Sequence, residues 1–147
     1  MNIYLDIDGV ILANEKSLAP YAEDFLEYVI SKYPDNVYWL TTHCWKGENR
    51  AVDVLAPLLR PEVVKLIKKI KSTEWGDLKT DAINFKHPFI WLDDDLLPEE
   101  KQVLVNNKAI NNFVHIDLAK NPNQLWDYWT HTDFGELIKK YEATHYT

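Results

Sequence analysis

The sequence contains a single cysteine, Cys44, among its 147 residues, which excludes an internal disulfide framework. No repeated Cys/His spacing surrounds it, so a structural zinc site is also excluded. No apolar run approaches the roughly 18 residues that span a bilayer, and the N-terminus lacks the basic flank of a secretion signal. We therefore expect a reducing, cytoplasmic location and no membrane partner.

Basic residues are also few, with 16 Lys and Arg against 23 Asp and Glu, for a formal net charge of -7. Affinity for nucleic acid comes mainly from cations that neutralise phosphates, so we expect no general nucleic-acid-binding surface. A phosphorylated ligand is still compatible with this charge, because a divalent cation held by carboxylates makes its own pocket locally positive.

Glycine is scarce, with four residues, and no Gly/Ser linker, internal repeat or low-complexity stretch marks a domain boundary. We therefore expect one domain over residues 1–147, which at this length buries roughly 70% of its unfolded surface. What the chain has instead is a set of short apolar runs separated by longer segments of helical spacing. The runs cover residues 3–7, 37–40, 89–92 and 113–116.

This alternation predicts the α/β fold class, with a doubly wound, Rossmann-like parallel sheet and helices on both faces. Pro20, Pro61 and Pro98 fit the first turns of three helices, the first of which ends near Pro34. The lysines between residues 65 and 71 are expected on a solvated face of the second helix. Such sheets bind ligands at the carboxyl ends of their strands, so functional residues are expected there.

Aromatic residues are dense toward the C-terminus, ahead of a helix expected over residues 136–143. They are Trp126, Tyr128, Trp129 and Phe134. We expect them to cover the sheet, although exposed aromatic rings could instead stack on a base or contact a partner.

The clearest motif is Asp6-Ile7-Asp8-Gly9-Val10, at the end of the first apolar run. Residues two apart on a strand point the same way, so Asp6 and Asp8 would converge if extended geometry continued through them. Two close carboxylates repel unless a cation or a proton lies between them, so the pair requires a partner. An acidic strand end before a glycine turn is the plainer interpretation, but the complete string favours a functional one.

A second acidic motif, Asp93-Asp94-Asp95, follows the third apolar run directly. Three successive carboxylates repel one another, which favours metal binding through Asp93 or Asp94. The alternative is an acidic cap on the helix that Pro98 starts, and Asp95 could serve that purpose while the others bind metal.

Two weaker signals lie between these motifs. Thr41 and Thr42 end the second apolar run, where a hydroxyl can donate to an anionic oxygen without adding a competing charge. Lys79 lies two residues after Asp77, which could cap a short helix, and the ammonium could face a phosphate. His43 could edge a substrate pocket. A solvated lysine and a packed or solvated histidine are the plainer interpretations.

Taken in order, these segments resemble the four motifs of the haloacid dehalogenase superfamily. The resemblance spans residues 3–95 and depends on Asp6-x-Asp8-Gly9-Val10, Thr41, Lys79 and Asp93-Asp94. It implies a haloacid dehalogenase-like fold and an enzyme of the phosphatase type. The dehalogenases of the superfamily lack the second aspartate of the first motif, so its presence here favours phosphate chemistry.

The family implies a role for each of these residues. Asp6 would be the nucleophile that is transiently phosphorylated, and Asp8 the general acid and base. Thr41 and Lys79 would bind the phosphoryl group. Mg²⁺ would be the cofactor, held by Asp6, by the backbone carbonyl of Asp8 and by one or both residues of the last acidic motif.

The connections on either side of Thr41 are too short for the cap domain that many members of the superfamily insert. The resemblance therefore implies that the site is open to solvent. In the superfamily, open sites are associated with large substrates such as phosphoproteins or polynucleotide ends, or with a cap supplied by another subunit. An oligomeric assembly is therefore one of the expected alternatives. The strings WLTT (39–42) and WLDD (91–94) also resemble a capless group of small bacterial proteins related to domains proposed for RNA repair. The lack of a basic patch counts against this narrower resemblance.

The sequence thus predicts a Mg²⁺-dependent phosphomonoester hydrolase whose phosphorylated substrate is a nucleotide, a nucleic-acid end or another accessible phosphate. Two alternatives stay open. A non-catalytic binding module would keep the fold and work through the aromatic C-terminal region, although it has no need of a paired nucleophile and acid. A phosphotransferase would pass the same aspartyl phosphate to an acceptor other than water.

Overall fold

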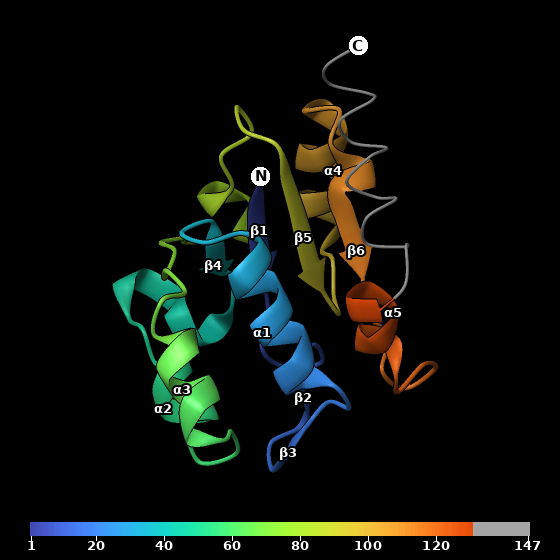
Figure 1. The fold of residues 1–147 in the computed structure, drawn as a ribbon. Coiled ribbons are helices and arrows are strands. Elements are labelled where there is room, and N and C mark those ends of the chain that lie inside the picture. Colours follow the sequence, from blue (N-terminus) through green and yellow to red (C-terminus); the bar gives the residue numbers. More distant parts are fainter. Residues whose placement is uncertain (131–147) are drawn as a thin grey trace.

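The computed structural model describes residues 1–130, whose centre is a four-stranded sheet (Figure 1). The strands are β1 (Asn2–Leu5), β4 (Val37–Trp39), β5 (Phe89–Asp93) and β6 (Phe113–His115). They lie in the order β4-β1-β5-β6, and every neighbouring pair is parallel. The predicted α/β class with a parallel sheet is therefore confirmed. All four predicted strands are present, with ends that differ from the prediction by at most two residues.

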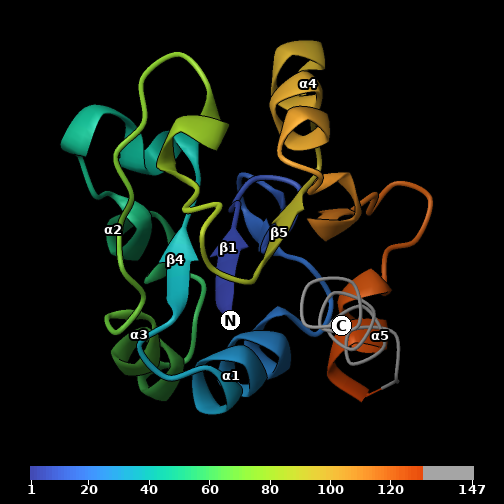
Figure 2. The ribbon, with the colours of Figure 1, turned by 90° about the horizontal axis from the view of Figure 1, so that it is seen from above.

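Helices cover both faces of this sheet, as Figure 2 shows from above. On one side lie α1 (Ala22–Lys32), α3 (Pro61–Ile67) and α5 (Gln124–Thr130), which pack on the larger hydrophobic core. On the other lies α4 (Pro98–Asn106), which packs on the smaller core. Because successive strand residues point to opposite faces, Leu5 enters the larger core and Tyr4 the smaller one.

Two of the three prolines lie in the first turn of a helix as predicted, whereas Pro20 lies before its helix. Pro61 and Pro98 are the first residues of α3 and α4, where their missing N–H leaves no helical hydrogen bond unmade. Pro20 precedes α1 by two residues, and that helix ends just before Pro34. The lysines at positions 65, 68, 69 and 71 are exposed as predicted, but α3 ends at Ile67, so only Lys65 lies on the helix.

Several short elements escaped prediction because none is long enough to show a periodic pattern. A hairpin of β2 (Leu12–Asn14) and β3 (Ser17–Leu18) follows β1, and Figure 1 shows it at the end of the molecule toward which the β5 and β6 arrowheads point. The others are η1 (Thr42–Gly47), α2 (Ala51–Leu55) and η3 (Ile110–Asn112). The short helix expected after Asp77 is present as η2 (Lys79–Ala82). Hence the β1–β4 connection holds the hairpin and α1, and the β4–β5 connection holds η1, α2, α3 and η2.

The two expected acidic helix caps are not formed by the residues predicted. The N-cap of η2 is Leu78 rather than Asp77, and its backbone N–H donates to the Asp81 carboxylate at 3.3 Å. The N-cap of α4 is Leu97 rather than Asp95, and its N–H donates to Glu100 at 3.0 Å. In both helices a carboxylate inside the first turn reaches back to the cap, so a preceding aspartate is not needed.

The aromatic C-terminal region is described only in part. The Trp126 ring lies 4.7 Å from that of Tyr21 between centroids, and Tyr128 packs against the larger core. The Trp129 side chain, Phe134 and the helix expected over residues 136–143 lie outside the part that is described. Within residues 1–130, no helix is long and apolar enough to cross a membrane.

Two buried threonines provide a matched test of the packing. The Thr73 hydroxyl donates to the Trp39 carbonyl at 2.7 Å, whereas the buried Thr80 hydroxyl has no hydrogen-bond partner among residues 1–130. Thr73→Val is expected to lower the free energy of unfolding by about 1 kcal/mol, whereas Thr80→Val leaves it unchanged or raises it. Urea denaturation followed by circular dichroism measures both, and equal losses in the two variants would contradict this packing.

Candidate functional site

The predicted site residues gather at the carboxyl ends of three neighbouring strands. Asp6 follows β1, Thr41 lies just beyond β4, and Asp93 is the last residue of β5. Since these strands are parallel and adjacent, their ends meet at one edge of the sheet. Lys79, the first residue of η2, reaches the same edge from the β4–β5 connection.

Lys79 lies between two buried carboxylates. Its Nζ is 2.7 Å from Asp93 Oδ2 and 3.5 Å from Asp6 Oδ2, and its side chain is only 13% exposed. Its backbone N–H donates to Glu100 Oε2 at 2.8 Å, which fixes the start of η2 against α4. Lys79 is therefore a largely shielded cation at the centre of the site rather than a solvated lysine.

Three aspartates form a cluster around this lysine. Each of Asp6, Asp93 and Asp94 offers an oxygen, and these oxygens lie within 4.8 Å of one another. Asp6 and Asp93 are buried, whereas Asp94 is exposed. With all three ionised, one lysine cannot balance them, so the cluster has the charge and the oxygen donors that suit a hard divalent cation.

The pKa values of these groups reflect the same crowding. Burial raises the pKa of Asp6, against the opposing effect of the Lys79 ammonium. Burial and the charge of Asp6 raise the pKa of Asp93 to about 7, and burial with the Asp93 carboxyl raises the pKa of Asp94 to about 6. Although burial opposes a charge on Lys79, its carboxylate neighbours raise its pKa, so the ammonium stays protonated.

Asp8 lies apart from this cluster, which differs from the expected convergence with Asp6. β1 ends at Leu5, and the Ile7 carbonyl then accepts hydrogen bonds from three N–H groups of a tight turn, so extended geometry is lost before Asp8. The Asp8 side chain is 59% exposed, and its Oδ2 lies 3.0 Å from His43 Nε2. His43 thus contacts the carboxylate of Asp8, whereas the adjacent Cys44 side chain is buried in the larger core.

The two threonines have different surroundings. Thr41 is fully buried, its hydroxyl accepts from His43 N at 3.3 Å, and that hydroxyl helps to lower the pKa of Asp6. Thr42 begins η1 and is exposed. Thr41 therefore belongs to the cluster side of the site, and Thr42 to its surface.

The site opens into a cavity of about 640 Å³ between the β2–β3 hairpin and η1. Its polar lining residues are Asp8, Asn14, Glu15, His43 and Asp94, and the others are Gly9, Leu12, Ala13 and Val54. Asp94 belongs both to this lining and to the aspartate cluster.

Sequence reasoning missed one residue that builds the site, Glu100. It is buried and accepts from both Lys79 N and Leu97 N, so it connects η2 to the first turn of α4. Its position three residues after the cap is the available signal, because a glutamate there commonly bonds back to the N-cap amide.

Gly9 provides a direct test of how closely the site is packed. Its φ of 77° lies in the left-handed region, and the space that a Cβ would occupy is taken by the Asp94 carboxylate. Gly9→Ala is expected to lower the free energy of unfolding by more than about 1 kcal/mol and to weaken Mg²⁺ binding by displacing Asp94. Calorimetric titration with Mg²⁺ and thermal unfolding measure the two effects.

The matched control is Gly76→Ala, because a Cβ at Gly76 meets nothing within 4 Å. This control is expected to bind Mg²⁺ as the unchanged chain does. Identical Mg²⁺ affinity in both alanine variants would contradict the placement of Asp94 against Gly9.

No family model, no curated protein and no solved structure matches this chain. The functional evidence for this protein is therefore the arrangement of its own side chains. In that geometry a largely shielded lysine and three clustered aspartates lie beside a cavity with a separate, exposed aspartate. Such an arrangement can hold a hard cation and bind an anion next to it.

Proposed function

We propose that this protein is a Mg²⁺-dependent phosphomonoester hydrolase with a haloacid dehalogenase-like fold and no cap domain. The observation that carries the proposal is the contrast between Asp6, buried beside the Lys79 ammonium, and Asp8, exposed on the cavity beside His43. Two nearby carboxylates in such different environments suit two different tasks in acid and base chemistry. The resemblance of the sequence motifs assigns the same two tasks to the same two residues.

The residues present fit a divalent cation. Asp6, Asp93 and Asp94 supply oxygens within 4.8 Å of one another, and only one ammonium group contacts this cluster in the described part of the chain. Asp93 already accepts from Lys79 and from the Asp95 N–H, which leaves Asp94 as the better direct ligand. A bound Mg²⁺ would neutralise charge so that a phosphate monoester can approach the Asp6 carboxylate.

In the first step an Asp6 oxygen attacks phosphorus, and the bond from phosphorus to the ester oxygen breaks. The product is an acyl phosphate on Asp6 and an alkoxide, which takes a proton from the Asp8 carboxyl. The Lys79 ammonium and the Thr41 hydroxyl are placed to stabilise the charge on the other phosphoryl oxygens, because both already lie against Asp6.

In the second step Asp8 acts as a base. It removes a proton from a water molecule that attacks phosphorus, which releases inorganic phosphate and regenerates the Asp6 carboxylate. The His43 ring orients Asp8 toward the cavity through the 3.0 Å contact. Because Asp8 is exposed and lines the cavity, it can reach both the leaving group and the water.

The substrate enters from solvent. The connections around Thr41 hold only the hairpin, the crossover helices and short 3₁₀ turns. We therefore propose a phosphorylated substrate large enough to extend beyond the cavity, such as a nucleotide or a nucleic-acid end, acting in the cytoplasm.

Substitution of the two aspartates tests the proposed roles. Asp6→Asn is expected to abolish turnover, because an amide cannot form the acyl phosphate. Asp8→Asn is expected to slow release of phosphate by about 10²–10⁴-fold from alkyl esters and far less from aryl esters, whose leaving groups need no proton. Phosphate release in the presence of Mg²⁺ is measured with both ester types. Wild-type rates in Asp6→Asn, or an equal loss on both esters in Asp8→Asn, would refute this assignment.

The raised pKa values predict how stability depends on pH when Mg²⁺ is absent. Asp93 and Asp94 have pKa values of about 7 and about 6 in the folded protein, against an ordinary value of 3.8. Between about pH 4 and about pH 7 the folded state therefore binds more protons than the unfolded state. The free energy of unfolding is therefore expected to fall as the pH rises from about 4 to about 7. Thermal unfolding in EDTA across this range measures the loss.

Added Mg²⁺ should reverse that loss, with a larger effect at about pH 8 than at about pH 5, because protons compete for the same carboxylates. Excess Mg²⁺ at 100 times its dissociation constant adds about 2.7 kcal/mol. Asp94→Asn serves as the control and is expected to reduce the Mg²⁺ effect. Equal stabilisation at both pH values would contradict the aspartate cluster as the cation site.

A further inference from the structure

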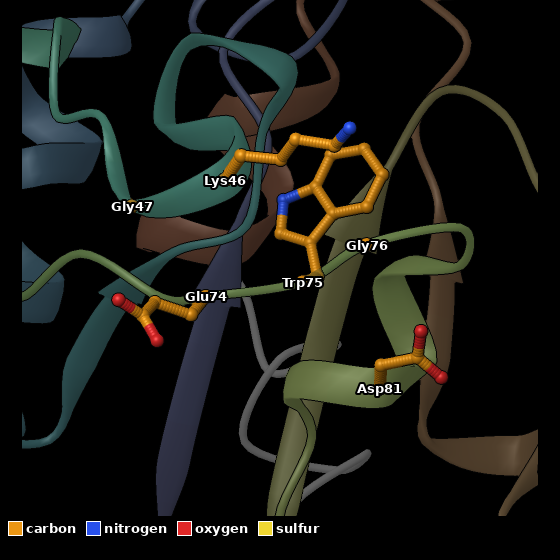
Figure 3. A pocket seen from close by; sticks show the side chains of 6 residues that line it. All are labelled: Lys46, Gly47, Glu74, Trp75, Gly76 and Asp81. Atoms are coloured by element: carbon orange, nitrogen blue, oxygen red, sulfur yellow. The ribbon is translucent and has the colours of Figure 1, made fainter.

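A second cavity of about 390 Å³ lies between η1 and the segment that leads into η2. Its lining residues are Lys46, Gly47, Glu74, Trp75, Gly76 and Asp81, all labelled in Figure 3. In that view the Trp75 indole lies in the upper middle, with the carboxylate of Glu74 below it to the left and that of Asp81 below it to the right. The proposed hydrolysis uses none of these six side chains.

Two indole rings form the aromatic part of this region. The ring centroids of Trp45 and Trp75 lie 6.5 Å apart at an interplanar angle of 51°, and Trp45 is 44% exposed. Trp45 Nε1 donates to the Gly76 carbonyl at 2.9 Å, and Trp75 Nε1 donates to the Thr41 carbonyl at 3.3 Å. Both polar atoms are thus bonded to protein, which holds the rings in place. Trp75 packs in part against the smaller core, and its remaining surface lines the cavity.

Lys46 adds a charge to this region. Its φ of 52° is uncommon for a residue other than glycine, and its Nζ lies 4.4 Å from the centroid of the Trp45 ring. The cation-binding position over Trp45 is therefore already filled by the protein's own ammonium group. A cationic ligand would meet this like charge, and an extra phosphate would meet the carboxylates of Glu74 and Asp81.

The elements that line this cavity adjoin those of the proposed phosphate site. Trp75 bonds to the backbone of Thr41, whose hydroxyl faces Asp6, and Asp81 belongs to the same short helix as Lys79. η1 contributes His43 to the larger cavity and Lys46 to this one. The Trp75 cavity thus lies beside the proposed phosphate site, where one substrate molecule could contact both.

We infer that the Trp75 cavity binds a nucleobase of the substrate, an inference that rests on the proposed function of the adjoining site. A nucleobase is flat and uncharged, so any of the bases can stack on the face of an indole ring. Its ring N–H and amino groups can donate to Glu74 and Asp81, which a phosphate cannot do. A nucleobase therefore suits both the indole ring of Trp75 and the carboxylate acceptors of Glu74 and Asp81 in this cavity.

The test uses adenosine, which has no phosphate, so that its result is independent of hydrolysis. Adenosine is titrated into the full ¹⁵N-labelled chain, and the tryptophan indole N–H signals are followed by nuclear magnetic resonance. The signals of Trp45 and Trp75 are expected to shift together in a saturable manner, with their identity established from single-tryptophan substitutions.

Two substitutions of Trp75 test whether an aromatic ring is required for adenosine binding. Trp75→Phe and Trp75→Leu both lose the bond to Thr41, but only the first retains an aromatic face. Trp75→Leu is expected to weaken adenosine binding about tenfold relative to Trp75→Phe. Tyr21→Leu, which removes an exposed aromatic ring that lines neither cavity, is expected to bind adenosine as the unchanged chain does.

Circular dichroism and thermal unfolding of each variant establish that it is folded. Saturation by adenosine without shifts at Trp45 and Trp75, equal affinity in the two Trp75 variants, or binding of tetramethylammonium in place of adenosine would each overturn the inference. Phosphate release with no adenosine binding would reject this nucleobase site alone. Adenosine binding without any phosphatase activity would reject the proposed function alone.

Discussion

An excess of carboxylates over ammonium groups at one edge of the sheet is the constraint on which the rest of the site depends. Lys79 contacts Asp6 and Asp93, yet the cluster with Asp94 carries more negative charge than one lysine neutralises. Backbone N–H groups reduce the cost, since Ile7 donates to Asp6 and Asp95 donates to Asp93. The remaining charge calls for a proton or a cation, so the raised pKa values and the candidate metal site have one cause.

The sheet order brings the carboxylates together, and the early end of β1 keeps Asp8 apart from them. Because β1 lies between β4 and β5, the carboxyl ends of all three strands lie side by side. Glu100 on α4 accepts from the Lys79 backbone N–H and so fixes the position of Lys79 next to these strand ends. Because β1 ends at Leu5, the chain turns before Asp8 and carries that carboxylate out to His43 and the cavity. The same turn therefore separates Asp6, which is buried beside the Lys79 ammonium, from Asp8, which is exposed beside His43.

Much of this arrangement follows from local sequence signals. A continuous apolar run predicts β5, which is buried along its whole length, and Pro61 and Pro98 predict the starts of α3 and α4. The acidic motifs at strand ends predict where Asp6, Asp93 and Asp94 lie, because parallel strands end at one edge.

The remaining features depend on contacts between segments distant in sequence. The Asp8–His43 contact joins residues 35 apart, and the Trp75–Thr41 bond joins residues 34 apart. No periodic pattern encodes such pairs. The cap predicted at Asp95 fails for a local reason, because α4 begins two residues later than such a cap requires and Glu100 bonds to the Leu97 N–H instead.

The proposed aspartyl phosphate is tested most directly by finding which residue, if any, carries a phosphoryl group during turnover. The protein is mixed with an aryl phosphate and Mg²⁺, quenched in acid within one turnover, digested and analysed by mass spectrometry. The account predicts one added phosphate on the peptide that contains Asp6, and none on it in Asp6→Asn. A label on Thr41, His43 or Cys44, or rapid turnover with no label on Asp6, would contradict the account.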